Sequence, residues 1–185
     1  MRLKDKVCIV TGGGSGIGRA TALLFAGEGA RLLVVDKRNA QAVAAECAAK
    51  GAQAIAVEAD VAVGADVKRV METTVERFRR LDVLVNNAGL DLHDDLSDRA
   101  GLDRHLTVNL FGTYGVTQAF LPLLARSRGA IVNVLSLAAL AGLPFTPAYS
   151  IPKAAALSLT QSLRALWAGR GVRVHASSPV PWTPI

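Results

Sequence analysis

The sequence of 185 residues contains only two cysteines, Cys8 and Cys47, and it has no CxxC pair and no cluster of cysteine with histidine. This scarcity argues against a disulfide framework and predicts no metal site, so we expect both thiols to be reduced. No apolar run approaches the roughly 20 residues that a membrane-spanning helix needs. The charged start, MRLKDK, is unlike a signal peptide. These absences favour a cytoplasmic protein with no membrane partner.

Acidic residues are also in the minority, with 15 Asp and Glu against 21 Lys and Arg, which leaves a net charge of +6. The basic residues are scattered in short groups at the ends of predicted elements, where cations solvate surfaces and complement helix ends. We therefore expect no nucleic-acid partner; a positive field that attracts an anionic cofactor is the better interpretation. No internal repeat or linker divides the chain, and its length suits one domain over residues 1–185.

Apolar runs alternate with segments of helical periodicity along the whole chain. This rhythm predicts an α/β fold, a doubly wound parallel sheet with helices on both faces, because strands that are apolar throughout are typical of such sheets. We expect strands at 7–10, 32–36, 53–57, 82–86 and 130–135 and from 172 onward. We expect helices at 18–29, 39–50, 64–80 and 148–170, and a long one that follows the polar connection 91–99 and runs to about 126.

The first unit, from Lys6 to Asp36, reads as strand, glycine turn, helix and strand. The turn, TGGGSGIG at 11–18, directly precedes the helical pattern, and Asp36 ends the second apolar run. Glycines allow close approach of a pyrophosphate to a helix N-terminus, and a carboxylate in that place can bind a ribose diol. A turn that only packs helix on strand is the alternative. The context favours a Rossmann-type dinucleotide site.

A second pattern places Tyr149 and Lys153 four residues apart, on one face of a predicted helix. A tyrosine that exchanges protons near pH 7 needs its pKa lowered from about 10, at a cost on the order of 4 kcal/mol, and a neighbouring ammonium favours the phenolate. Ser136 ends the fifth strand, so its hydroxyl should face the same crevice. Pro152 is tolerable if the helix begins at 148 or 149. An isolated pair of this kind is more often a surface pair.

Together these motifs resemble the short-chain dehydrogenase/reductase family over nearly the whole chain. Residues 11–18 resemble its TGxxxGxG motif, residues 86–89 its NNAG motif, and Tyr149 with Lys153 its YxxxK pair. The resemblance implies that Tyr149 transfers the proton, Ser136 orients the substrate oxygen, and Lys153 binds the nicotinamide ribose and lowers the tyrosine pKa. It implies that Asn109 holds a water linked to Lys153, although by itself Asn109 reads as a cap or a polar helix residue.

The resemblance also assigns cofactor contacts. Asp60 and Val61 match an adenine-contacting pair, although Asp60 alone reads as an acidic loop residue. The implied cofactor-binding set is Gly12, Ser15, Gly16, Ile17, Gly18, Asp36, Asp60, Val61, Asn87, Ala88, Gly89, Tyr149, Lys153 and Thr183.

Asp36 bears on the identity of the cofactor. Its carboxylate suits both ribose hydroxyls of NAD and repels the 2′-phosphate of NADP. Lys37 and Arg38 favour the opposite choice, but the turn carries no basic residue at Gly14 or Ser15. We expect NAD, with NADP as the weaker alternative.

Near its end the chain departs from the family pattern. Pro179 and Thr183 match, whereas Val180 replaces a glycine and His175 a common asparagine. The resemblance implies a further strand and substrate-covering helices after Ile185, so we expect a domain truncated at its C-terminal end. Two functions follow as hypotheses: hydride transfer between NAD(H) and a secondary alcohol or ketone, or an inactive dinucleotide-binding or partner-binding module.

The substrate and the assembly are less sharply indicated. The apolar loop 137–147 suggests a hydrophobic or compact small-molecule alcohol or carbonyl compound. Relatives pair through two long helices, so a homo-oligomer, dimer or tetramer, is expected. The apolar faces of 108–121 and 154–166 suit such pairing, and they equally suit burial in the core.

Overall fold

The computed structural model describes residues 1–179, so the predictions for Val180 and Thr183 lie outside the described residues. Six parallel strands form one sheet in the order β3-β2-β1-β4-β5-β6. This confirms the predicted doubly wound α/β fold with helices on both faces. The strands are β1 (Val7–Thr11), β2 (Arg31–Asp36), β3 (Ala54–Glu58), β4 (Val83–Asn86), β5 (Ala130–Val134) and β6 (Arg173–Ser177).

The helices follow the predicted rhythm, with ends that differ by a few residues. They are α1 (Gly16–Gly27), α2 (Ala40–Ala49), α3 (Gly64–Phe78), α4 (Arg99–Leu106), α5 (Thr113–Ser127) and α6 (Pro147–Trp167), with the short segments η1 (Thr107–Gly112), η2 (Leu137–Ala139) and η3 (Ala168–Arg170). Within residues 1–179 no helix has the length and apolarity to cross a bilayer.

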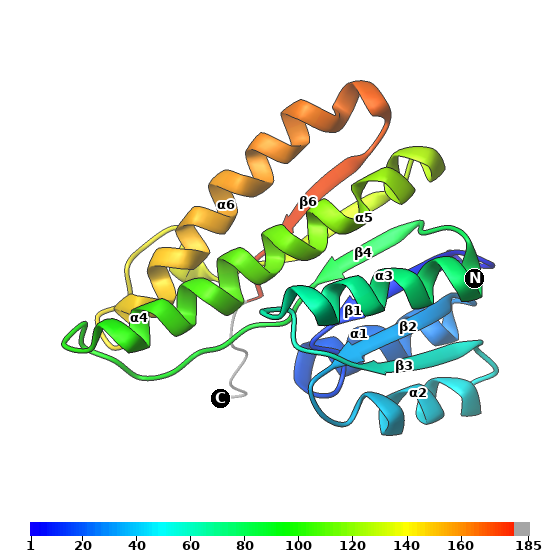
Figure 1. The fold of residues 1–185 in the computed structure, drawn as a ribbon, viewed down its shortest axis with the longest axis horizontal. Coiled ribbons are helices and arrows are strands. Elements are labelled where there is room, and N and C mark those ends of the chain that lie inside the picture. The colour runs from blue at the N-terminus through cyan, green and yellow to red at the C-terminus, as the bar shows by residue number, and fades with distance from the viewer. Residues whose placement is uncertain (180–185) are drawn as a thin grey trace.

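The order of the strands reverses beside β1, because β2 and β3 lie on one side of it and β4, β5 and β6 on the other (Figure 1). Parallel pairing brings the carboxyl ends of all six strands to one edge of the sheet. Ligands of doubly wound proteins bind at that edge, in the crevice where the order reverses. At this place in the sheet lie Thr11, at the end of β1, and Asn86, at the end of β4.

Alternate residues of the buried strands face two separate apolar layers. On β1, Val7 and Ile9 pack with α3 and α5, whereas Cys8 and Val10 pack with α1 and α2. Figure 1 shows α3, α5 and α6 together on one side of the sheet. Both cysteines are fully buried, and burial raises the pKa of the Cys8 thiol to about 12, which makes it a core residue.

The predicted long helix is interrupted by a different winding. Between α4 and α5 lies η1, one stretch of π-helix, and Asn109 is buried within it. The Thr113 hydroxyl donates to the Asn109 carbonyl oxygen at 3.1 Å. Such π-bulges are frequent at functional sites. Apolar periodicity continues through a bulge, so the sequence pattern does not reveal it.

Three local features differ from what the sequence pattern suggests. Ile17 and Leu24 are apolar residues of the first helical pattern, yet they are 51% and 58% exposed, because the small residues Ala22 and Ala26 fill the contact with the sheet. Asn39 lies at the start of α2, but in the left-handed conformation (φ 59°) and without a capping hydrogen bond. Because α6 begins at Pro147, Pro152 is its sixth residue and lies beyond the first four unpaired N–H groups.

Candidate active site

The glycine turn between β1 and α1 contains glycines of two kinds. Added Cβ atoms at Gly12 and Gly18 would collide with the chain itself, the first lying 2.7 Å from the Ala88 Cα and the second overlapping the Gly12 carbonyl oxygen. At Gly16, by contrast, φ is +50° and a Cβ would meet nothing within 4 Å. Gly16 is the first residue of α1, so the N-terminus of this helix has an open face that suits a phosphate.

Asp36 closes a hollow of about 240 Å³ at the end of β2. Its Oδ2 accepts from the Gly14 N–H and its Oδ1 from the Arg38 N–H, both at 2.9 Å, so the half-buried carboxylate is held by the backbone. Asp60 and Val61 line the same hollow. The Lys37 ammonium lies 2.8 Å from an Asp60 oxygen, and this contact, with the Ala62 N–H, outweighs burial and lowers the pKa of Asp60.

The NNAG segment fastens the end of β4 to the glycine turn. The Thr11 hydroxyl oxygen accepts from the N–H groups of Asn87 and Ala88 at 3.0 and 3.1 Å. The Asn87 amide in turn donates to the carbonyl oxygens of Thr11 and Gly12, both at 3.0 Å. The predicted cofactor residues Asn87 and Ala88 therefore also hold the glycine turn in place by hydrogen bonds to Thr11 and Gly12.

The first asparagine of that segment joins the sheet to its helices. Asn86 donates to Thr117 of α5 and to Asn133 of β5, both at 2.9 Å. Asn133 in turn donates to Thr160 of α6 at 2.8 Å. All four side chains are buried, where hydrogen bonds to fixed partners are costly to break. This chain of hydrogen bonds fixes the position of α6, which carries Tyr149 and Lys153, against the sheet.

A larger crevice of about 700 Å³ brings Ser136, Tyr149 and Lys153 together. The Lys153 Nζ lies 5.5 Å from the centre of the Tyr149 ring and donates to the Val134 carbonyl oxygen at 2.9 Å. Gly89 borders both this crevice and the Asp36 hollow, so the two meet at the end of β4. The exposed Ile17 also lines the crevice. Residues predicted from distant motifs thus surround one continuous depression.

The pKa of Tyr149 is shifted in the direction opposite to the sequence-based expectation. Burial raises the pKa of the Tyr149 phenol, the Ser136 hydroxyl opposes this by hydrogen bonding, and the Asp91 carboxylate raises it further. The Lys153 ammonium is not among these influences. The expected lowering of the tyrosine pKa therefore needs more than this protein surface supplies, and a positively charged ring beside the phenol would act in that direction.

Lys153 is buried, and burial lowers its pKa to about 8, with Asp91 opposing the change. An unfolded lysine titrates near 10.4, so the unfolded chain holds more protons between about pH 8 and 10.4, and stability rises with pH in that window. Relative to Lys153→Met, we expect the free energy of unfolding of the native protein to gain up to about 3 kcal/mol between these pH values. Urea unfolding of both proteins at several pH values tests this. Parallel stability curves would contradict it.

Asn109 lies 2% exposed in η1, and its side chain is hydrogen-bonded to the backbone of Leu90. Its Oδ1 accepts from the Leu90 N–H at 2.8 Å, and its Nδ2 donates to the Leu90 carbonyl oxygen at 2.7 Å. A Cβ added at Gly89 would lie 3.1 Å from Asn109 Oδ1 and 3.8 Å from Lys153 Nζ. The Asn109 Oδ1 and the Lys153 Nζ thus both lie close to Gly89, and the Asn109 amide anchors the loop that follows β4.

Three residues of that loop and its surroundings escaped the sequence reasoning. Asp91 and His93 line the crevice. His105 is completely buried in α4, accepts from the Leu92 N–H at 3.1 Å, and packs edge-on to Tyr149 with ring centres 6.4 Å apart. Asp91 was detectable, since it follows the carboxyl end of a parallel strand. His105 was not, because its neighbours come from segments far away in the sequence.

The remaining predicted positions are less central. Ser15 precedes α1 in extended conformation and makes no capping hydrogen bond with its side chain. His175 is exposed on β6, and within the described residues β6 pairs only with β5.

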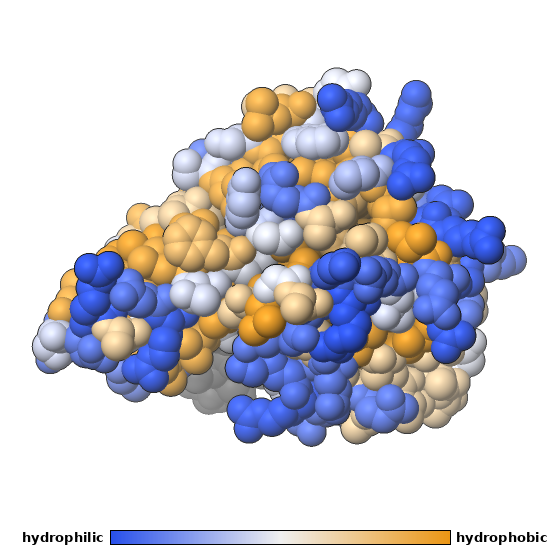
Figure 2. All heavy atoms as spheres, in the orientation of Figure 1, coloured by the Kyte–Doolittle hydropathy of each residue, from blue (hydrophilic) through white to orange (hydrophobic). Residues whose placement is uncertain are grey.

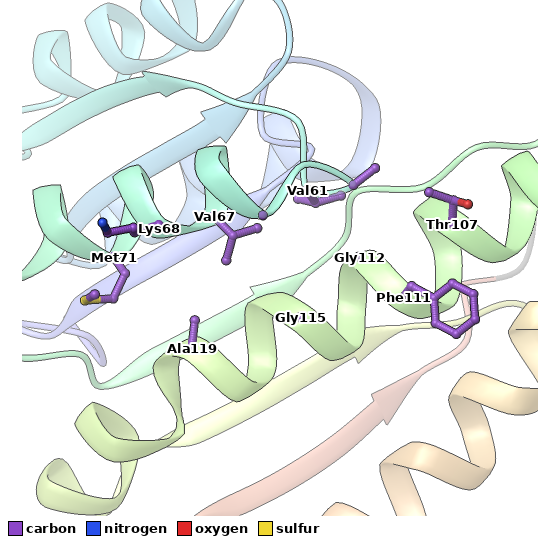
Figure 3. Close-up of a pocket in the computed structure, with 11 residues that line it drawn as sticks. Val61, Val67, Lys68, Met71, Thr107, Phe111, Gly112, Gly115 and Ala119 are labelled. Atoms are coloured by element: carbon purple, nitrogen blue, oxygen red, sulfur yellow. The ribbon is translucent and has the colours of Figure 1, made fainter.

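Another hollow, of about 440 Å³, lies between α3 and the η1–α5 helix. Figure 3 shows Val67 and Met71 on one wall and Ala119 and Phe111 on the other. Its lining is mostly apolar and carries no acid–base pair.

Comparison with known proteins shows which family has this sequence and this fold. The family model described as "short chain dehydrogenase" matches residues 6–183. The chain is 38% identical over 185 residues to a 3-oxoacyl-[acyl-carrier-protein] reductase FabG of Thermotoga maritima, covering 97% of this chain and 75% of that protein. It is 40% identical to 2-(S)-hydroxypropyl-CoM dehydrogenase 3 of Xanthobacter autotrophicus, covering 96% and 72%.

A solved structure agrees along the whole chain. The crystal structure of an NAD⁺-bound xylitol dehydrogenase superposes with a TM-score of 0.95 at 32% identity, covering 100% of this chain and 73% of the other. The family model, the sequence relatives and the solved structure agree with the motifs and with the parallel sheet. The chain belongs to the short-chain dehydrogenase/reductase family of oxidoreductases.

Proposed function

We propose that this protein interconverts a secondary alcohol and a ketone with NAD as the cofactor, and that Tyr149 exchanges the proton with the substrate oxygen. One observation carries the proposal: Ser136, Tyr149 and Lys153 line a single crevice that adjoins the hollow closed by Asp36. The crevice offers a proton carrier and a hydroxyl at one place. The hollow offers a carboxylate that suits a ribose.

The residues of the glycine turn fit a dinucleotide. The open face at Gly16, at the first turn of α1, suits the pyrophosphate, and Asp36, Asp60 and Val61 surround the place for an adenosine. Bound there, the nicotinamide ring supplies the acceptor or donor of hydride. Asn87 to Gly89 border the path from one end to the other.

Tyr149 then acts as the acid or base on the substrate oxygen, and Ser136 hydrogen-bonds that oxygen and holds it beside the phenol. The Lys153 ammonium is buried beside the ring and is placed to bind a ribose hydroxyl, and a positively charged nicotinamide ring would favour the phenolate. Asn109 holds the loop that borders Lys153 through Leu90 and places its polar groups near the ammonium. Each role depends on position, because these side chains come from three separate segments: η1, the end of β5 and α6.

NAD is preferred to NADP in this proposal for two reasons. The Asp36 carboxylate stands where a 2′-phosphate would lie, and two like charges repel. Lys37, a neighbouring cation that could bind such a phosphate, is paired with Asp60. The xylitol dehydrogenase of the same fold was solved with NAD⁺ bound, which agrees with this preference.

The proposal includes a homo-oligomer, a dimer or a tetramer. Large apolar side chains are exposed on the η1–α5 helix and on α6, among them Phe111 (59%), Tyr114 (49%) and Leu166 (74%). Figure 2 shows apolar residues gathered over this side of the molecule. Burial of such a patch against a second copy would remove it from water.

The test is a spectrophotometric assay of NADH formation with NAD and a panel of secondary alcohols, and of NADH consumption with the matching ketones. We expect turnover with NAD and a much weaker response with NADP. Binding of NADH without turnover of any alcohol or ketone would instead support an inactive dinucleotide-binding module. Failure to bind NADH at all would contradict both functions.

A further inference from the structure

We propose that Asp91 sets the substrate class of the crevice, selecting neutral alcohols with a second hydroxyl near the reacting carbon and rejecting anionic ones. This inference rests on the proposed function, because it concerns the same crevice. Asp91 lines that crevice with Ser136 and Tyr149, two residues beyond Gly89. The residue is exposed, and it borders the space where a substrate would lie.

The carboxylate is free to act on a ligand. Within residues 1–179 it accepts no hydrogen bond and joins no ion pair, unlike Asp94 and Asp95 of the same loop, whose oxygens accept backbone N–H groups. An exposed carboxylate without a partner accepts hydrogen bonds from hydroxyl groups and repels other anions. Its purpose is therefore not explained by the fold.

The loop that carries Asp91 is pinned at three points, so the carboxylate has a defined place. The Leu92 N–H donates to His105 at 3.1 Å, and His105 Nδ1 donates to the Gly101 carbonyl oxygen at 2.8 Å, which assigns the tautomer. His93 Nδ1 donates to the Phe145 carbonyl oxygen at 3.2 Å. The third attachment, at Asp94, holds the loop against α6.

Asp94 makes the third attachment across a separation of 54 residues. Its two oxygens accept from the Ala148 N–H, at 3.0 and 3.2 Å, in the first turn of the helix that carries Tyr149. The attachment is favourable because a carboxylate complements the positive end of a helix dipole. The loop and the start of α6 are thus joined, and Asp91 keeps its position relative to Tyr149. A preorganised acceptor loses little entropy when it binds a hydroxyl.

The charge of Asp91 already reaches the reacting groups. It raises the pKa of Tyr149 and opposes the effect of burial on the pKa of Lys153. The same field acts on any charged group of a substrate in the crevice. Apolar side chains on the 136–147 segment, Leu143 and Phe145, line the crevice as well. A substrate that combines a small apolar part with a second hydroxyl matches both features.

Three alcohols with one carbon skeleton test the inference: 2-butanol, 2,3-butanediol and 3-hydroxybutyrate. Each contains the same CH₃–CHOH group, and they differ by a neighbouring hydroxyl or a carboxylate. We expect the native protein to prefer the diol over 2-butanol in kcat/KM and to discriminate against 3-hydroxybutyrate. Asp91→Ala should reduce the diol preference at least about tenfold, since the acceptor is lost, and should improve the relative use of the anion by about fivefold or more.

Two further variants separate the causes. Asp91→Asn retains a hydrogen-bond acceptor but no charge, so it should relieve the rejection of the anion and keep most of the diol preference. Asp95→Asn is the matched control, since Asp95 lies in the same loop, its Oδ1 accepts from the Ser97 N–H, and it does not line the crevice. It should leave all three ratios unchanged. Equal ratios in native and Asp91→Ala protein would overturn the inference.

A binding measurement distinguishes failure of the proposed oxidoreductase function from failure of the inference about Asp91. Dissociation constants of the three alcohols, measured calorimetrically on NAD-saturated protein carrying Tyr149→Phe, report selectivity without turnover. These constants are then compared with those of the double variant that also carries Asp91→Ala. If the native protein produces no NADH and the constants still differ between the two variants, the inference would be supported and the oxidoreductase proposal contradicted. Turnover with selectivity independent of Asp91 would have the opposite meaning.

Discussion

Tyr149→Phe is expected to lower kcat for alcohol oxidation by about 10²–10⁴-fold, the usual contribution of a positioned acid or base. The substitution removes one oxygen and keeps the ring, so the edge contact with His105 and the packing in the crevice remain. Initial rates of NADH formation at saturating NAD measure the effect. Binding of NADH, followed by its fluorescence, should change little.

The chain supplies a matched control for this experiment in its only other tyrosine. Tyr114 lies 49% exposed on α5 and does not line the crevice, so Tyr114→Phe should leave kcat unchanged. Turnover by Tyr149→Phe equal to that of the native protein would refute the role of the phenol. Loss of turnover together with loss of NADH binding would indicate damage to the fold instead.

Asp36→Ala is expected to raise KM for NAD by about 10- to 100-fold, because a hydrogen bond to a charged group contributes about 1.5–3 kcal/mol. The same change removes the charge that opposes a 2′-phosphate, and Arg38 remains exposed beside it. In Asp36→Ala, kcat/KM for NAD should therefore fall and kcat/KM for NADP should rise. The ratio of the two should change by a larger factor than kcat/KM for either cofactor. Steady-state kinetics with both cofactors and one alcohol measures this ratio.

Glu58→Ala is the matched control for the cofactor experiment. Glu58 is the partner of Asp36 in the register of β2 and β3, and it is exposed. Its removal changes the net charge by the same amount at the neighbouring position, so a general electrostatic effect would appear in both variants. An unchanged KM for NAD in Asp36→Ala would show that the ribose is held elsewhere.

Much of the fold follows from local patterns in the sequence. Apolar strands and turn residues recur at short range, so the alternation of strands and helices and the parallel sheet were predicted, and the structure confirms them. The errors arise where packing overrides local preference. In α1, the close approach of helix to sheet selects Ala22 and Ala26 for burial and leaves the larger Leu24 outside. Hydrophobicity alone ranks these residues in the opposite order.

The candidate site shows the same division. Ser136, Tyr149, Lys153 and Asp36 belong to motifs whose residue types and spacing carry chemical meaning, so the sequence indicates them. The lowered pKa of Lys153, by contrast, depends on the burial of its ammonium group by the folded chain. The raised pKa of Tyr149 depends on the surrounding protein and on Asp91, which no spacing rule connects with it.

By itself the sequence determined the class of fold, the family and the identity of the chemical groups, since these depend on short-range patterns of hydrophobicity, glycine and functional side chains. Only the tertiary structure decided which segments meet. It joined the glycine turn to β4 through Thr11, fastened the Asp91 loop to α6 through Asp94, and placed His105 against Tyr149. The physical reason is that hydrogen bonding, burial and electrostatic influence depend on distance in space, and residues separated by many positions carry no local signal of their proximity.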